Sequence, residues 1–131
     1  MIYSYELEKQ LLAGLLKEPQ ALTEICNFIN ISDFYSEQSS LNSTIFRIIE
    51  QAVNAGEDVD EIIIAQRVND VGISFEDNLN PSDYIKSLSL RKVPSGNTIK
   101  TAKELKKYSI RREIFKSSNT IKKRKGKKEC L

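Results

Sequence analysis

The chain has 131 residues, 40% hydrophobic and 29% charged, which predicts a single globular domain with a sizeable core. It has no histidine, and its five glycines form neither a G-x-G-x-x-G motif nor a P-loop, so the usual acid–base catalyst and a phosphate-cradling loop are excluded. The net charge is +2, but residues 100–131 contain 13 Lys or Arg against 3 Asp or Glu, and residues 1–99 contain 7 against 15. We therefore expect an acidic body with a basic end.

The two cysteines, Cys26 and Cys130, are far apart in sequence and show neither disulfide nor metal-ligand spacing. We expect Cys26 to be a small core residue and the protein to work in a reducing cytoplasm. No apolar stretch approaches the roughly 18 residues of a membrane span, and the first residues lack the pattern of a signal peptide. The sequence therefore predicts no membrane partner, no metal and no cofactor.

Apolar residues at helical spacing predict two helices in the first quarter of the chain. The first, Glu6–Lys17, contains Gly14, which costs about 1 kcal/mol relative to alanine inside a helix, and a close helix–helix crossing would explain it. Pro19 suits the first turn of the second helix. Phe34 and Tyr35 lie in the loop that follows. We expect both rings to dock on the core rather than to stack on nucleic-acid bases, because no basic residue lies near them in sequence.

The stretch Thr44–Val68 predicts a helix pair around which the rest of the chain packs. The first apolar stripe stops before Gly56, a residue that tolerates the positive φ of a helix end. Asp60 suits the N-cap of the next helix, because its carboxylate can accept hydrogen bonds from free N–H groups of the first turn. We expect that helix to carry its apolar surface on Ile62, Ile63, Ile64, Ala65 and Val68.

The rest of the chain predicts a loop, a short helix and a long helix. Asn69–Pro81 is rich in breaker and acidic residues, and we expect Phe75 and Leu79 to tie this loop to the core. Ser82–Leu90 predicts a short helix. A long helix begins near residue 98, and its apolar stripe drifts after Tyr108, which indicates that a different neighbour takes over there. We therefore expect this helix to project from the globule toward a partner.

The expected organisation is a globular helical domain over residues 1–96, a long helix over residues 97–120 and a basic flexible tail over residues 121–131. Like charges along the tail oppose a packed structure. The tail is either a solvated end or a contact with phosphates or an acidic partner surface. The residues that would contact nucleic acid are Lys122, Lys123, Arg124, Lys125, Lys127 and Lys128.

Several short segments match, in order, the pattern of a known family. They are Glu8–Leu16 (EKQLLAGLL), Ile31–Tyr35 (ISDFY), Ile45-Phe46, Ala55–Asp60 (AGEDVD), Asp83–Leu88 (DYIKSL), Pro94–Asn97 (PSGN) and Arg111–Glu113 (RRE). Together they resemble the N-terminal domain of the bacterial-type replicative DNA helicases, the DnaB family, over about residues 5–116. The sequence departs from the family at Asn42, near which a histidine is usual, and it contains no ATPase motor.

The resemblance implies an all-α fold: a compact bundle of about six helices whose long C-terminal helix leads into a helical hairpin. Domains of this family pair through the hairpin, three dimers form the collar of a hexameric ring, and the collar docks primase and some helicase loaders. The resemblance therefore implies no enzyme activity for this chain, because ATP and Mg²⁺ belong to the motor domain. The residues expected at the partner interface are Leu105, Tyr108, Ile110, Arg111, Arg112, Ile114 and Phe115.

Two functional hypotheses follow. The first is a non-catalytic collar domain of a replicative helicase, acting in the primosome of a bacterial, phage or plastid-type replisome. If the chain ends at Leu131, the second hairpin helix is lost and self-association should be weaker than in an intact collar. The alternative is a small stand-alone relative that binds DNA through its basic tail or modulates a helicase ring.

Overall fold

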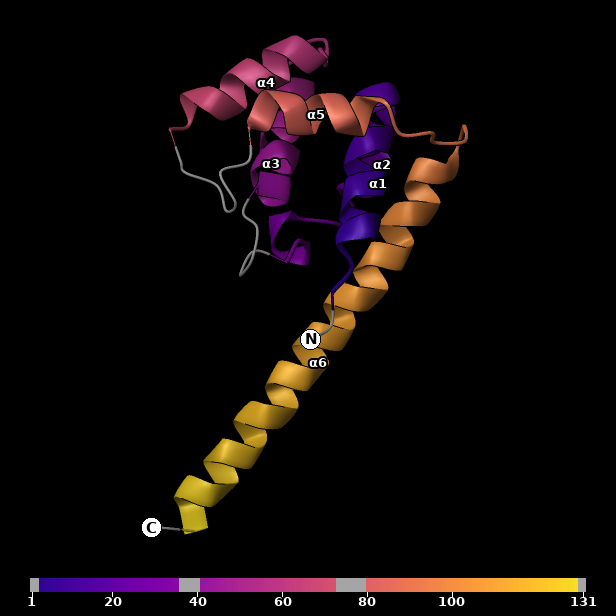
Figure 1. The fold of residues 1–131 in the computed structure, drawn as a ribbon. Coiled ribbons are helices and arrows are strands. Elements are labelled where there is room, and N and C mark those ends of the chain that lie inside the picture. The colour runs from indigo at the N-terminus through magenta and orange to yellow at the C-terminus, as the bar shows by residue number, and fades with distance from the viewer. Residues whose placement is uncertain (1–2, 36–40, 73–79, 130–131) are drawn as a thin grey trace.

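A computed structural model describes residues 3–35, 41–72 and 80–129, with side chains of the last helix described as far as Ser117. Within these residues it has six α-helices, two short 3-10 helices and no strand, which confirms the all-α class. The elements are α1 (Tyr5–Lys17), η1 (Pro19–Ala21), α2 (Leu22–Ile25), η2 (Ile31–Asp33), α3 (Leu41–Asn54), α4 (Glu61–Asp70), α5 (Pro81–Ser89) and α6 (Asn97–Glu129). Helices α1–α5 form a globule, and α6 lies along one side of it and continues far beyond (Figure 1).

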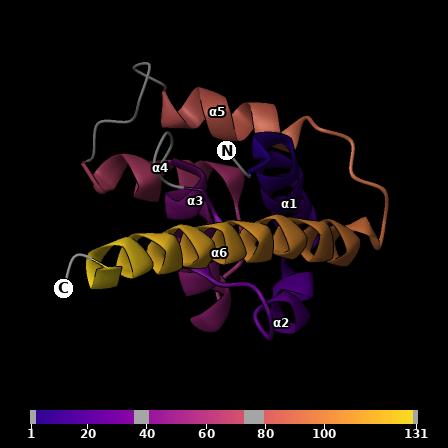
Figure 2. The same cartoon turned by 90° about the horizontal axis from the view of Figure 1, so that it is seen from below.

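Helix α1 begins at a side-chain cap and buries one face. The Ser4 hydroxyl oxygen accepts a hydrogen bond from Leu7 N at 3.2 Å, which satisfies one of the free N–H groups of the first turn. The last turns of α1 cross α6, and a Cβ built on Gly14 would lie 2.8 Å from Thr98 Cγ2 and 3.0 Å from Thr98 Cβ. This confirms the predicted close crossing at Gly14, and Figure 2 shows α6 running across the bundle.

The turn between α3 and α4 lies where the sequence predicts, although α3 begins earlier than Thr44, at Leu41, and α4 ends later than Val68, at Asp70. Gly56 has φ 73°, and the Asp60 carboxylate accepts hydrogen bonds from Ile62 N at 2.7 Å and Ile63 N at 3.2 Å. The expected apolar surface of α4 is wrong in part, because the side chains of Ile62 and Ile63 are 77% and 46% exposed. Only the residues spaced to face α3 and α5 are buried, and these are Ile64, Ala65 and Val68.

The core extends into the first half of α6. Ala102 and Leu105 are fully buried in the core, where α6 packs chiefly on α1. The core also contains the tilted ring pair of Phe34 and Phe46, whose centroids lie 4.9 Å apart. The docking of Phe34 and Tyr35 on the globule is confirmed by their burial. The first turns of α6 therefore supply part of the core.

Cys26 is exposed, so its predicted place in the core is wrong. Helix α2 is only four residues long, and Leu22 and Ile25 take its core positions. The Cys26 thiol instead donates to Glu50 Oε2 at 3.4 Å. The predicted anchors Phe75 and Leu79 lie outside the described residues. None of the described helices combines the length and the hydrophobicity that crossing a bilayer demands.

We expect Gly14→Ala to destabilise the chain by about 1–2 kcal/mol, because overpacking against Thr98 outweighs the roughly 1 kcal/mol gain in helix propensity. Thr98→Ala in the same chain removes the hydroxyl and methyl groups that lie closest and leaves Cβ, so it should restore most of the lost stability. Urea unfolding of the two single variants and the double variant measures this coupling. A Gly14→Ala chain as stable as the wild type would contradict the close crossing.

Candidate partner interface on helix α6

The loop between α2 and α3 is held in place by its own capping interactions. Asn30 Oδ1 accepts a hydrogen bond from Ser32 N at 3.0 Å, and Asp33 Oδ2 accepts one from Asn30 N at 2.8 Å. These reciprocal bonds form a capping box around η2. Asp33 is thereby buried with a fixed orientation at the surface of α6.

Asp33 connects this loop to α6 through three residues spaced along the helix. Its Oδ1 accepts hydrogen bonds from Lys106 Nζ at 3.1 Å and Ser109 Oγ at 2.5 Å. Its backbone carbonyl accepts from Arg112 Nη2 at 2.7 Å. We call these four residues the Asp33 clamp. Lys106 to Arg112 spans about 9 Å of helix, so the clamp sets both the rotation and the direction of α6.

A second buried carboxylate, Glu8, joins α1 to the other helices. Its oxygens accept hydrogen bonds from Tyr35 N at 2.9 Å and Asn42 Nδ2 at 3.0 Å, and Asn42 Oδ1 accepts from the Tyr84 hydroxyl. Burial raises the pKa of Glu8, and these hydrogen bonds together with the charge of Arg112 only partly oppose the rise. Burial, together with the Glu8 charge, raises the pKa of Tyr84 to about 12.

Within and beyond the span of the clamp, α6 exposes three large apolar side chains. Ile110, Ile114 and Phe115 are 48%, 62% and 57% exposed, and we call them the α6 ridge. Ile110 and Ile114 lie one turn apart on the face opposite Leu105 and Ser109, which are buried. Large exposed apolar residues gathered on one helix are a mark of an interaction surface.

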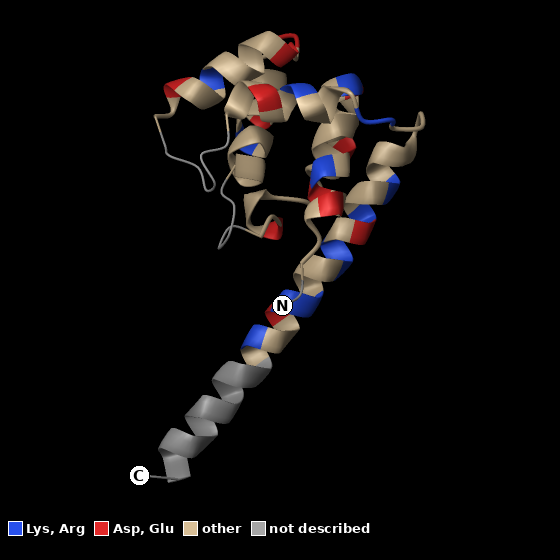
Figure 3. Cartoon of the chain, in the orientation of Figure 1, with Lys and Arg blue, Asp and Glu red and all other residues tan. Residues whose placement is uncertain are grey.

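Basic side chains share the exposed face of α6 with the ridge. Helical spacing places Lys103, Lys107 and Arg111 beside Ile110 and Ile114, and all five are exposed. Lys107 Nζ bonds Glu104 Oε1 at 2.9 Å, and the Arg111 guanidinium lies over the Tyr108 ring at 5.4 Å. Figure 3 marks the Lys and Arg positions in blue along the described part of α6. The face is therefore both apolar and positively charged.

The predicted interface residues fall into two groups. Ile110, Arg111, Ile114 and Phe115 are exposed, and Tyr108 is half-buried beneath Arg111. Leu105 is fully buried in the core, so its assignment to a partner contact is wrong.

Arg112 also departs from its predicted place at the interface. It is only 8% exposed, because it serves the clamp and lies over the Tyr35 ring at 5.6 Å. Sequence reasoning missed Asp33, Lys106 and Ser109. The signals that could have found them are the aspartate inside ISDFY and the three-residue spacing on the long helix.

The predicted nucleic-acid contacts, Lys122–Lys128, lie beyond Ser117, outside the described side chains. The backbone of α6 is helical to Glu129, so the helix continues past residue 120, where the sequence predicts a tail. Lys, Arg and Glu favour helix, which accounts for the continuation. The flexibility and the nucleic-acid contact of this stretch stay predictions.

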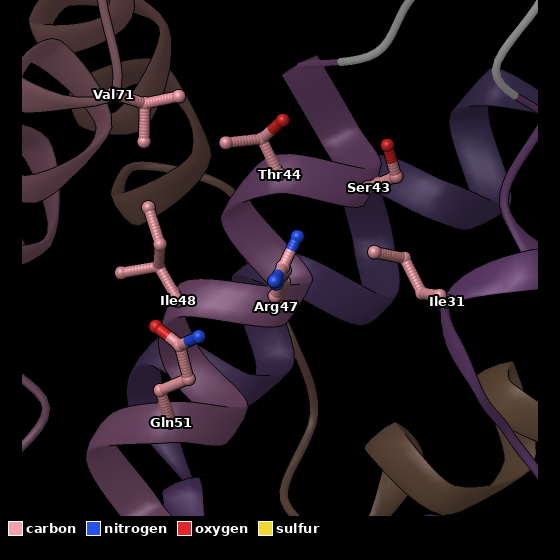
Figure 4. A pocket seen from close by; sticks show the side chains of 7 residues that line it. All are labelled: Ile31, Ser43, Thr44, Arg47, Ile48, Gln51 and Val71. Atoms are coloured by element: carbon pink, nitrogen blue, oxygen red, sulfur yellow. The ribbon is translucent and has the colours of Figure 1, made fainter.

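The described surface also has a hollow of about 460 Å³ between η2, α3 and the end of α4 (Figure 4). Its lining residues are Ile31, Ser43, Thr44, Arg47, Ile48, Gln51 and Val71. Arg47 is the one charged group among them, so no acid–base pair is present in the lining. Among the described residues no three His, Cys, Asp or Glu side chains converge as metal ligands would.

The described residues thus define an all-α domain with a projecting terminal helix. Residues 1–107 match the family model described as the DnaB-like helicase N terminal domain. The chain therefore belongs to the family of DnaB-like helicase N-terminal domains, as its motifs predicted. The matched family is the N-terminal domain alone, and no ATPase motor domain is found with it.

The fold is similar to that in the crystal structure of the N-terminal domain of DnaB helicase from Mycobacterium tuberculosis, with a TM-score of 0.79 and 17% sequence identity. The similarity covers 93% of this chain and 84% of that one. No curated protein sequence matches the chain. At this identity the likeness establishes the fold.

We expect Asp33→Asn to destabilise the chain by about 2 kcal/mol, because a neutral amide weakens the bonds from Lys106 and Ser109 and turns its NH₂ group toward Asn30 N–H. Asp58→Asn is the matched control, since Asp58 is exposed and its change should stay within about 0.5 kcal/mol. Urea unfolding measures both variants. Equal loss in the two would argue against the clamp.

We expect Glu8 to make stability depend on pH. Because its folded pKa is raised, the folded chain holds this proton more tightly than the unfolded chain. Stability from Glu8 is therefore lost as pH rises from its ordinary pKa of 4.5 through the raised folded value. Glu8→Gln lacks this titration, so the difference in unfolding free energy between wild type and variant should fall over that window. Parallel pH curves would refute this.

Proposed function

We propose that this chain is the non-catalytic interaction domain of a replicative DNA helicase. It mediates subunit pairing in the hexamer and docks a primase or a loader during DNA replication. The observation that carries the proposal is the α6 ridge: three large apolar side chains stand exposed on a helix whose preceding turns are held rigidly by the core and the Asp33 clamp. Such a helix presents an apolar face in a fixed direction, which lowers the entropy cost of binding a partner.

The composition of the site supports binding rather than catalysis. The chain has no histidine, and the charged side chains of the clamp are engaged in holding α6. The residues left for outside contacts include Phe115 and Arg111, which are of types enriched where proteins meet. Membership of the DnaB-like N-terminal domain family supports a role in a helicase assembly.

The pairing role predicts that the average mass of the wild-type chain rises with concentration in sedimentation equilibrium. Ile114→Ser/Phe115→Ser should lower self-association at least tenfold, because truncating central apolar contacts costs more than about 1.4 kcal/mol. Leu90→Ser is the matched control, since Leu90 is a comparably exposed apolar residue at the end of α5. A monomer at all concentrations, or equal effects of both changes, would overturn the proposal.

A further inference from the structure

The hollow between η2, α3 and the end of α4 contains a cation without a partner. Arg47 is exposed, and it forms no hydrogen bond or ion pair with any other residue that the structure describes. Glu50, three positions further along α3, accepts a hydrogen bond from the Cys26 thiol. Residues 1–99 contain 15 Asp or Glu against 7 Lys or Arg, so an arginine without a carboxylate partner is unexpected there. The charge of Arg47 is therefore available to an anion from outside the chain.

Gln51 supplies a second donor to the same hollow. It lies one turn after Arg47 on α3, it is exposed, and its amide has no hydrogen-bond partner within the described part of the chain. Ser43 and Thr44 also line the hollow, but their polar groups are already engaged. Figure 4 shows Arg47 in the middle of the lining residues with Gln51 on the following turn. The hollow thus offers a guanidinium and an amide to the same ligand.

The walls of the hollow are apolar. Ile31 in η2 and Val71 at the end of α4 are 44% and 45% exposed, and they lie on either side of Arg47 in Figure 4. Ile48 is nearly buried and lies between the polar residues of α3. The volume of about 460 Å³ is within the range of about 300–1,000 Å³ that is usual for ligand sites. An apolar side chain of a ligand would therefore be covered on several sides.

The balance of charge in the hollow fits a carboxylate better than a phosphate. One guanidinium balances one carboxylate and binds it through two parallel hydrogen bonds. A phosphate dianion would keep an uncompensated charge beside Ile31, Ile48 and Val71, which is costly in apolar surroundings. None of the described lining residues is aromatic, so a nucleobase would have no ring to stack on. The matching ligand carries a carboxylate next to an apolar group.

We propose that this hollow binds a segment of a partner protein in which an Asp or Glu lies beside a Leu, Ile or Val. The carboxylate binds Arg47 and Gln51, and the apolar side chain packs between Ile31 and Val71. The inference rests on the proposed function, because an interaction domain calls for a protein rather than a metabolite as the ligand. No residue of α6 lines the hollow, so this site is separate from the α6 ridge.

Selection from a displayed library of random peptides, with the full chain as bait, tests the inference. The wild type should enrich peptides that contain an acidic residue beside an aliphatic one. Arg47→Glu should lose this enrichment, because its carboxylate repels the acidic residue. Lys86→Glu is the matched control, since Lys86 is exposed on α5 and gives the same change in charge elsewhere. Absence of such peptides, or equal enrichment by Arg47→Glu, would overturn the inference.

Calorimetry with one enriched peptide separates the two parts of the site. Arg47→Gln should weaken binding at least tenfold, because it removes charge-assisted hydrogen bonds. Val71→Ser should weaken binding roughly threefold or more through the lost apolar contact, while the thermal unfolding curve stays the same, since Val71 is 45% exposed. A glutamate with both ends capped should bind at least tenfold more weakly than the peptide. Equal binding of the capped glutamate would reduce the hollow to a simple anion site and would contradict the inference.

Sedimentation equilibrium distinguishes this inference from the pairing role. Arg47→Glu should leave self-association unchanged, because the α6 ridge lies elsewhere. Weaker self-association of this variant would place a second copy in the hollow, which would refute a partner protein as its ligand. If the wild type self-associates but selects no acidic peptide, the inference fails and the pairing role stands. If peptides bind at Arg47 but the chain stays monomeric, the pairing role fails and the inference stands.

Discussion

The Asp33 clamp is the constraint on which the arrangement of this domain depends. The buried carboxylate of Asp33 is oriented by the capping box of η2 and accepts hydrogen bonds from Lys106 and Ser109. The backbone carbonyl of Asp33 accepts a hydrogen bond from Arg112. Buried polar groups of this kind are costly unless every partner is in place, so the clamp favours a single position of α6. Without it, α6 would be held chiefly by apolar contacts, which tolerate rotation and sliding more readily.

The same helix therefore has two roles along its length. Its first turns are core, where Leu105 is buried and Gly14 of α1 allows the two backbones to approach closely. The turns after Arg112 leave the globule and show an apolar and basic face to solvent. Because one continuous helix joins both parts, the packing of the globule decides where the exposed face points.

Local features could be predicted from the sequence, and those set by distant neighbours could not. The crossing at Gly14, the turn at Gly56 and the cap at Asp60 follow from backbone chemistry that acts within a few residues. The exposure of Ile62 depends on which side of α4 meets the bundle, which periodicity alone does not decide when three isoleucines are adjacent.

The same limit explains the corrections along α6. The contacts of Asp33 reach residues more than seventy positions away, and no local pattern reveals them. Leu105 and Arg112 are therefore buried against the globule, where the sequence predicts a partner contact. The exposed group of Ile110, Ile114 and Phe115 was within reach of sequence analysis, because the apolar stripe changes its direction after Tyr108.

A cluster of tyrosine rings contacts α6 through Arg112, and its optical signals can report on the position of this helix. Tyr3 stacks on Tyr35 with centroids 4.5 Å apart, Tyr5 lies 6.2 Å from Tyr35, and the Arg112 guanidinium covers the Tyr35 ring. The chain contains no tryptophan to mask their emission. Tyrosine fluorescence and near-ultraviolet circular dichroism therefore report whether α6 is packed against the globule, without any attached label.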